Sequence, residues 1–302
     1  MGRPLYARAV LVLFVPVLIF FSIFPQQAFS KEDPKIKIVT TLFPQFDFTR
    51  QIGKDRVDVV LLLPPGVEAH SFEPKPRDMA LINGSDIFIY TDRNMEPWAL
   101  SLLKGVKNKG LAAVEAGKGV RRMGSDPHIW LDMDNASLMA DNIADALIGK
   151  DPENRAYYEE NLKAYKLKLR QMDERFRAAF AKCRTRVFIY AGHPAFGYFT
   201  RRYNLTCLSP YKGYSPDSEP APRSVMELVD RIRENGIKIV YYEELLPPKL
   251  AATIAAETGA GTLPLNGAHN VGKDDIKAGV TFLSIMEEDL INLKKGLECS
   301  QM

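Results

Sequence analysis

The chain has 302 residues, of which 46% are hydrophobic and 25% charged, as in ordinary globular proteins. Its formal net charge is only +3, and no basic stripe is interleaved with aromatic residues, which argues against a nucleic-acid-binding protein. The length suits one large domain or two medium domains, each able to bury a core.

The first thirty residues have the pattern of a secretory signal peptide. Two arginines precede an apolar run from Ala9 to Phe24, and Ala28 and Ser30 occupy the −3 and −1 positions of a candidate cleavage site. The alternative is a permanent membrane anchor, but the uncharged stretch is short for a span and charged residues follow at once. No cysteine stands near this site, so we expect an exported mature chain that begins at Lys31 and carries no lipid anchor.

Beyond residue 30, apolar runs of strand length alternate with helical patterns, which predicts βαβ units and parallel sheets. In the first half we expect strands at 35–40, 57–63 and 86–90 and helices at 43–52, 77–83 and 97–104. In the second half we expect strands at 186–191, 205–209, 238–242 and 261–265 and helices at 195–203, 224–235, 248–258 and 278–297. The two runs predict two similar α/β lobes.

A long helical pattern separates the two halves. Residues 152–181 place apolar side chains such as Tyr158, Leu162 and Tyr165 at helical spacing, and about thirty residues of helix span roughly 45 Å. The alternative, a coiled-coil arm, needs more heptads than the stretch contains. We therefore predict a signal peptide at 1–30, an N-terminal lobe at 31–150, a linking backbone helix at 151–182 and a C-terminal lobe at 183–302.

The three cysteines, Cys183, Cys207 and Cys299, are far apart and form no CxxC pair. Export favours disulfides, so one bridge and one free thiol are expected, but the spacing does not identify the pair. A zinc site made of thiolates is not expected without paired spacing.

The four histidines of the chain all stand in predicted loops. His70, His193 and His269 come after predicted strands, and His128 lies in a loop before the middle helices. Ligands of such sheets bind outside the carboxyl ends of the strands, and the strands of two lobes can face one cleft. Taken alone, a histidine is more often a surface or core residue. Four at such positions favour a shared metal site in the interlobe cleft, since neutral imidazole is the commonest metal ligand.

Around these histidines the chain resembles a known family. Segments such as LLLPPGVEAHSFEP, DPHIWLDMDN and AGHPAFGYF are similar to those of the zinc/manganese group of periplasmic solute-binding proteins of ABC importers. The resemblance extends from about residue 35 to residue 293. It implies two α/β lobes with parallel sheets, one long backbone helix and an interlobe metal site. It also implies a monomeric periplasmic receptor that delivers a transition-metal ion to an inner-membrane ABC permease.

The resemblance further implies a set of metal ligands. His70, His128 and His193 stand on three family motifs, and manganese-type members have a carboxylate at the place of His193. The imidazole there favours Zn2+, with Mn2+ or iron as the alternative cargo. The fourth family ligand is usually an Asp, which the loop LPLNGAHN lacks. His269, Asn266 or a water can take its place, and we favour His269 because an amide oxygen is a poor zinc ligand.

Residues near the motifs allow two interpretations each. Glu68 and Glu73 either orient a ligand histidine or are solvated charges. Glu243 matches a family position, as a cleft or structural residue rather than an established ligand, and we expect Trp98 and Trp130 in the core.

Two other classes of function are possible on this sequence. A zinc hydrolase needs three protein ligands, an open metal position and a base, but HExxH, a nucleophile elbow and a second-metal carboxylate cluster are all missing from the sequence. A surface adhesin would need a separate adhesive module, which the sequence does not offer. We therefore expect a binding protein without a catalytic cofactor, and not an enzyme.

Overall fold

The first lobe is built on a parallel sheet. The computed structural model describes residues 1–2, 34–214, 220–245 and 247–300, so the predicted signal peptide lies almost wholly outside it. The strands are β1 (Ile36–Thr40), β2 (Val57–Leu61), β3 (Ile87–Tyr90) and β4 (Ala112–Glu115), in the spatial order β2-β1-β3-β4. The helices are α1 (Phe43–Gly53), α2 (Pro76–Asn83) and α3 (Ala99–Lys104), with a 3-10 turn at Lys54–Arg56. The central strand β3 is buried along its whole length, as expected for a parallel strand covered on both faces.

The second lobe repeats this topology. Its strands are β5 (Val187–Tyr190), β6 (Thr206–Leu208), β7 (Ile239–Glu243) and β8 (Gly261–Leu265), in the order β6-β5-β7-β8 and again parallel. Its helices are α6 (Gly197–Tyr203), α7 (Pro222–Asn235), α8 (Lys249–Thr258), α9 (Lys273–Ala278) and α10 (Phe282–Gly296). In both sheets the second strand lies outside the first, and the third and fourth follow on the other side. The prediction of two similar α/β lobes is confirmed.

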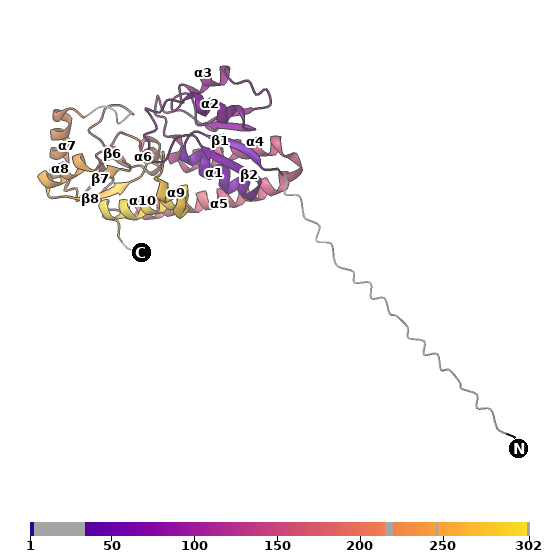
Figure 1. Ribbon diagram of the computed structural model, residues 1–302. Coiled ribbons are helices and arrows are strands. Elements are labelled where there is room, and N and C mark those ends of the chain that lie inside the picture. The colour runs from indigo at the N-terminus through magenta and orange to yellow at the C-terminus, as the bar shows by residue number, and fades with distance from the viewer. Residues whose placement is uncertain (3–33, 215–219, 246, 301–302) are drawn as a thin grey trace. The chain divides into compact units, whose positions relative to one another are not determined.

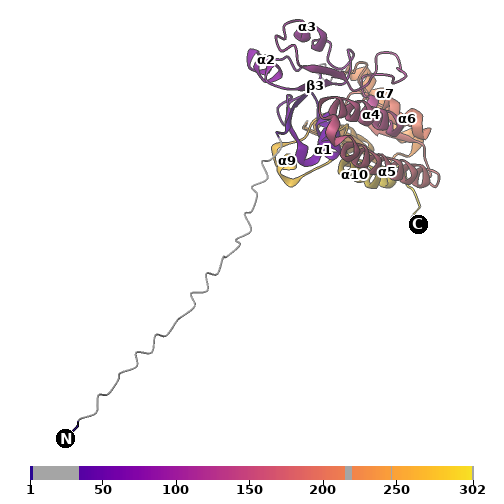
Figure 2. The same ribbon diagram turned by 90° about the vertical axis from the view of Figure 1, so that its right-hand side faces the viewer.

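Two helices in the middle of the chain link the lobes. After a 3-10 turn at Ile129–Leu131, α4 (Met133–Lys150) begins at its N-cap Asp132. A second turn at Pro152–Asn154 leads into α5 (Arg155–Phe180), whose 26 residues measure about 39 Å. Figures 1 and 2 show α5 running beneath both lobes, with α10 beside it. The predicted single long helix is thus confirmed, with a 3-10 turn where the sequence pattern predicted its first residues.

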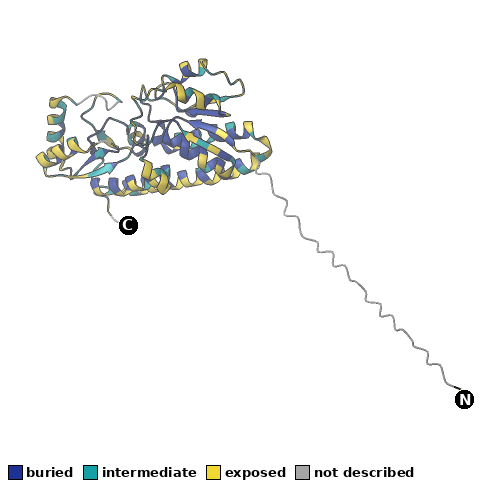
Figure 3. Ribbon diagram, in the orientation of Figure 1, coloured by how far each residue is buried: buried dark blue, intermediate teal, exposed yellow. Residues whose placement is uncertain are grey.

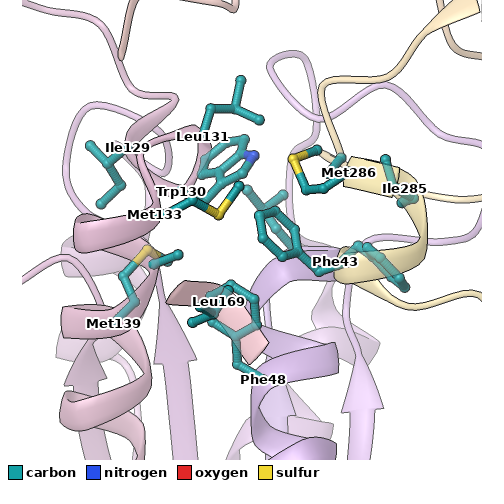
Figure 4. Close-up of a cluster of buried hydrophobic side chains, with 14 of the residues drawn as sticks. Phe43, Phe48, Ile129, Trp130, Leu131, Met133, Met139, Leu169, Ile285 and Met286 are labelled. Carbon is teal, nitrogen blue, oxygen red and sulfur yellow. The ribbon is translucent and has the colours of Figure 1, made fainter. Parts of the chain in front are cut away.

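One hydrophobic core runs through both lobes. Side chains of α1, α4, α5, α10 and the 3-10 turn at Ile129–Leu131 meet in it, among them Phe48, Trp130, Leu169 and Met286 (Figure 4). Smaller clusters lie on the outer faces, one between the first sheet and α2 and α3, and one between the second sheet and α7 and α8. Buried segments therefore continue from one lobe to the other in Figure 3. Since packed interiors resist deformation, the lobes are held in one arrangement rather than joined by a loose hinge.

A disulfide closes the C-terminal region. It joins Cys183, just after α5, to Cys299, just after α10, across 116 positions of sequence, and it leaves Cys207 as a free thiol. This resolves the pairing that the spacing left open. Burial raises the pKa of the Cys207 thiol, so this side chain is a weak nucleophile. Among the helices in the described part of the chain, none combines the length and apolar character that a bilayer span requires.

Two expectations about the secondary structure were wrong. The edge strand β4 was not predicted, because its residues AAVE carry little strand signal and pairing with β3 determines their conformation. The last helix was predicted from residue 278, but α9 ends there because Gly279 has a φ of 75°. The helix α10 begins only at Phe282, where the Thr281 hydroxyl accepts a hydrogen bond from the Ser284 N–H.

Candidate metal centre

The structure brings the four histidines together. His70 lies in the loop between β2 and α2, His128 precedes α4, His193 follows β5, and His269 follows β8. One ring nitrogen of each lies within 4.8 Å of those of the other three. His128, His193 and His269 are buried, and His70 is partly exposed. The loops come from both lobes, so the cluster occupies the interlobe position expected from the sequence.

The spacing of the ring nitrogens matches a tetrahedral ion. The Nε2 atoms of His70 and His128 are 3.2 Å apart, as are those of His128 and His193. Zn–N bonds of about 2.0–2.1 Å in a tetrahedron separate the nitrogens by about 3.3 Å. The Nε2 of His269 is buried and has no hydrogen-bond partner among the described residues. A cation between the rings would satisfy all of these lone pairs.

Three of the four rings are oriented by carboxylates. Each carboxyl group lies on the Nδ1 side of a ring. In its ionised form it can only accept, so Nδ1 then carries the hydrogen and Nε2 presents its lone pair to the centre. The pairs are His128 with Asp126 at 2.8 Å, His193 with Glu243 at 2.8 Å and His269 with Glu244 at 3.1 Å. The sequence analysis placed Glu243 in the cleft but missed Asp126 and Glu244. Two features of the sequence could have indicated them: Asp126 stands in the tripeptide DPH beside His128, and Glu244 directly follows Glu243 at the end of β7.

His70 is held differently. No partner for its Nδ1 is found in the described part of the chain, and Glu68 instead accepts hydrogen bonds from the backbone N–H groups of His70 and Ser71. Glu68 therefore orders the loop rather than the ring. On its outer side His70 faces a hollow of 360 Å³ that Glu73 and Trp98 also line. Trp98 is half-buried and packs against the core cluster between the first sheet and α2 and α3, and it also contributes to the wall of this hollow.

Burial keeps the imidazoles of His70, His128 and His269 uncharged. Desolvation, together with the neighbouring rings, lowers the pKa of His70 and of His269 to about 3 and that of His128 well below its ordinary value. Burial also raises the pKa of Asp126 to about 7 and raises that of Glu244. At neutral pH His70, His128 and His269 therefore offer neutral nitrogen donors, and the carboxyl groups of Asp126 and Glu244 would be ionised more readily beside a dication.

The loop that carries His269 is tightly specified. Ala268 has a φ of 57°, in the left-handed region, and its N–H donates to Asn266 Oδ1 at 2.7 Å. The carbonyl of Gly267 accepts from Trp130 Nε1 at 2.8 Å, and a Cβ on Gly267 would lie 2.4 Å from a ring carbon of His269. Only glycine fits there. The amide oxygen of Asn266 is thus used within the loop, while His269 reaches the other rings. Trp130 is buried as predicted and, in addition, ties the two lobes together.

Two like-ordered parallel sheets, a linking helix and a buried cluster of metal-ligand side chains between them define a metal-binding solute receptor. A family described as "ZnuA: Zinc-uptake complex component A periplasmic" matches residues 38–296. This chain belongs to that family.

Individual relatives agree with the assignment. The high-affinity zinc uptake system protein ZnuA of Bacillus subtilis strain 168 is 37% identical over 287 residues, which cover 89% of each chain. The zinc-binding lipoprotein AdcA of Streptococcus pneumoniae strain R6 is 31% identical over 285 residues, covering 88% of this chain but only 56% of AdcA. The crystal structure of the Zn(II)-bound ZnuA-like domain of S. pneumoniae AdcA is 32% identical, with a TM-score of 0.78 over 87% of this chain and 99% of that one.

Proposed function

We propose that this chain is an extracytoplasmic receptor that binds one Zn2+ ion and delivers it to an ABC-type membrane importer. The proposed ligands are His70, His128, His193 and His269. The observation that carries the proposal is the pair of 3.2 Å contacts between Nε2 atoms, together with the unpartnered Nε2 of His269. Nitrogens that face one another without hydrogen-bond donors are costly when buried, and a shared cation removes that cost.

The donor set favours zinc over manganese. All four proposed donors are imidazole nitrogens, whereas Mn2+ prefers carboxylate, carbonyl and water oxygens. The relatives named for zinc uptake and the Zn(II)-bound neighbour support the same cargo. The carboxylates stand one hydrogen bond away from the donors and supply the negative charge that a dication needs.

Binding without catalysis follows from a closed site. Four protein ligands fill a tetrahedron and leave no position for an activated water, which a zinc hydrolase requires. We further propose that residues 1–30 direct export to the periplasm and are removed, and that the mature chain works as a monomer. The ion itself is the substrate of this receptor.

Metal titration of the chain without residues 1–30 tests the proposal. Calorimetry and elemental analysis should give one Zn2+ per chain, and a large excess of Mn2+ should not displace it. Co2+ should produce the intense visible absorption of a tetrahedral site. Two equal zinc sites, no zinc binding, or displacement by equimolar Mn2+ would overturn the proposal, and hydrolytic turnover above that of free zinc would overturn the receptor assignment.

A further inference from the structure

A buried arginine ties together the segments that carry two of the four histidines. Arg202 lies in α6, and its side chain is only 7% exposed. Its Nη1 contacts Asp132 Oδ1 at 2.8 Å and Asp134 Oδ2 at 2.7 Å, and its Nε contacts Asp173 Oδ1 at 2.5 Å. Two of these carboxylates, Asp132 and Asp173, are themselves nearly buried. Buried charges of this kind persist only when they are paired in good geometry.

One arm of this cluster leads directly to His128. Asp132 ends the 3-10 turn that begins after His128, and the N–H of Leu131 donates to the His128 carbonyl at 3.3 Å. The same Oδ1 of Asp132 that pairs with Arg202 also accepts the N–H of Asp134 at 2.9 Å and so caps α4. The position of His128 in the folded protein is therefore coupled to that of Asp132 by a short, hydrogen-bonded turn.

The other arm leads to His193. The helix α6 starts only a few residues after His193, and the N–H of Ala195 donates to the His193 carbonyl at 2.7 Å. The beginning of α6 also contacts the segment before His128, because the Tyr198 hydroxyl accepts the N–H of Met123 at 2.9 Å. The helix is thus attached to the His128 segment at both of its ends, and Arg202 makes the closer charged attachment, at 2.8 Å from Asp132 against 4.0 Å for the more exposed Arg201.

We propose that Arg202 is a positioning residue, which sets the separation between His128 and His193 through its ion pair with Asp132 and thereby tunes metal affinity and geometry. The inference rests on the proposed function, in which both histidines bind the ion. Arg202 touches neither ring and acts through the two segments. Its contact with Asp173 attaches α6 to α5, and this part of the cluster serves stability alone.

A matched pair of substitutions separates the contact of Arg202 with Asp132 from its contact with Asp173. Asp132→Asn keeps a good N-cap for α4 but removes the charge that pairs with Arg202. Asp173→Asn removes the charge that pairs with Arg202 from α5. Arg202→Lys keeps the positive charge but loses the planar fork that reaches several carboxylates at once. We would measure zinc affinity by chelator competition, the visible spectrum of the Co2+-loaded protein, and the melting temperature of the metal-free protein.

If Arg202 positions the histidines, the variants should fall into two groups, one that loses zinc affinity and one that loses only stability. Asp132→Asn and Arg202→Lys should each weaken zinc binding by about 10- to 100-fold and reduce the Co2+ absorption, as is typical when groups that orient metal ligands are lost. Asp173→Asn should lower the melting temperature while affinity and spectrum stay those of the unmodified protein. Unchanged affinity and spectrum in both Asp132→Asn and Arg202→Lys would overturn the inference, as would an equal loss in Asp173→Asn. Failure of the proposed function looks different, because the unmodified protein itself would then bind no zinc.

Discussion

Replacing His269 by Ala removes the proposed ligand that departs most from the family pattern. Apparent binding energies of structural zinc sites are about 10–16 kcal/mol, so an equal share for each of four ligands is about 3 kcal/mol, or roughly a hundredfold in affinity. The substitution should destabilise the metal-bound protein and change the stability of the metal-free protein little. In the metal-free protein the Nε2 of His269 is buried and has no hydrogen-bond partner within the described ranges, so its removal offsets part of the lost packing.

Chelator competition with zinc, run beside thermal melts of the metal-free protein, measures both effects. Asn266→Ala is the matched comparison, because the amide oxygen of Asn266 accepts a hydrogen bond from the Ala268 N–H and so shapes the same loop. We expect a loss of about tenfold or less for Asn266→Ala and about a hundredfold for His269→Ala. A larger loss for Asn266→Ala than for His269→Ala would refute the assignment of the fourth ligand.

Three further predictions concern stability and packing. Burial raises the pKa of Glu96 from an ordinary 4.5 to about 7, so its favourable contribution is present below about pH 4.5 and is lost as pH rises through 7. Urea titrations of the metal-free protein should therefore show that its free energy of unfolding falls between pH 5 and 8, and that Glu96→Gln makes this fall smaller by up to about 3 kcal/mol. Parallel curves of unfolding free energy against pH for the two proteins would contradict this. A Cβ on Gly197 would lie 2.2 Å from Oδ2 of Asp126, whose other oxygen, Oδ1, contacts Nδ1 of His128, so Gly197→Ala should displace this carboxylate and weaken zinc binding by about 10- to 100-fold. Gly149→Ala, where a Cβ meets nothing within 4 Å, should leave affinity unchanged, and equal affinities for the two variants would rule out this explanation. Serine at both Cys183 and Cys299 opens a loop that spans 116 positions and should cost about 3–5 kcal/mol of unfolding free energy in denaturant titrations, whereas a loss below about 1 kcal/mol would exclude a stabilising bridge.

Much of the fold was predictable because its signals are local. Strands such as β3 and β7 are short apolar runs, and the helices between them have clear periodicity and punctuation by glycine and proline. The strand β4 has no such run. Its backbone pairs with β3 through contacts that its own four residues do not encode, and this kind of element escapes a reading of one sequence.

The four histidines of the candidate site were predictable from the sequence, but most of the carboxylates that contact their rings were not. The histidines were visible because they are few and follow strands, and the structure places them together. Asp126 is only two residues from His128, but the other two partners come from distant segments: Glu243 contacts His193 from another strand end, and Glu244 contacts His269 from another loop. No spacing in the chain reveals such a pair, nor which cysteine joins which. The domain limits and the ligand roles stay predictions until the experiments above are done.

The wide separation of the four histidines along the chain has a consequence for biogenesis. His70 and His269 stand at opposite ends of the folded unit's sequence, and the cluster exists only when loops from both lobes have docked. A partly synthesised, partly translocated or clipped polypeptide presents isolated imidazoles and no tetrahedron. On the proposed function, capture of zinc by all four histidines therefore requires the folded chain, and a receptor kept unfolded until export would not sequester zinc in the compartment where it is made.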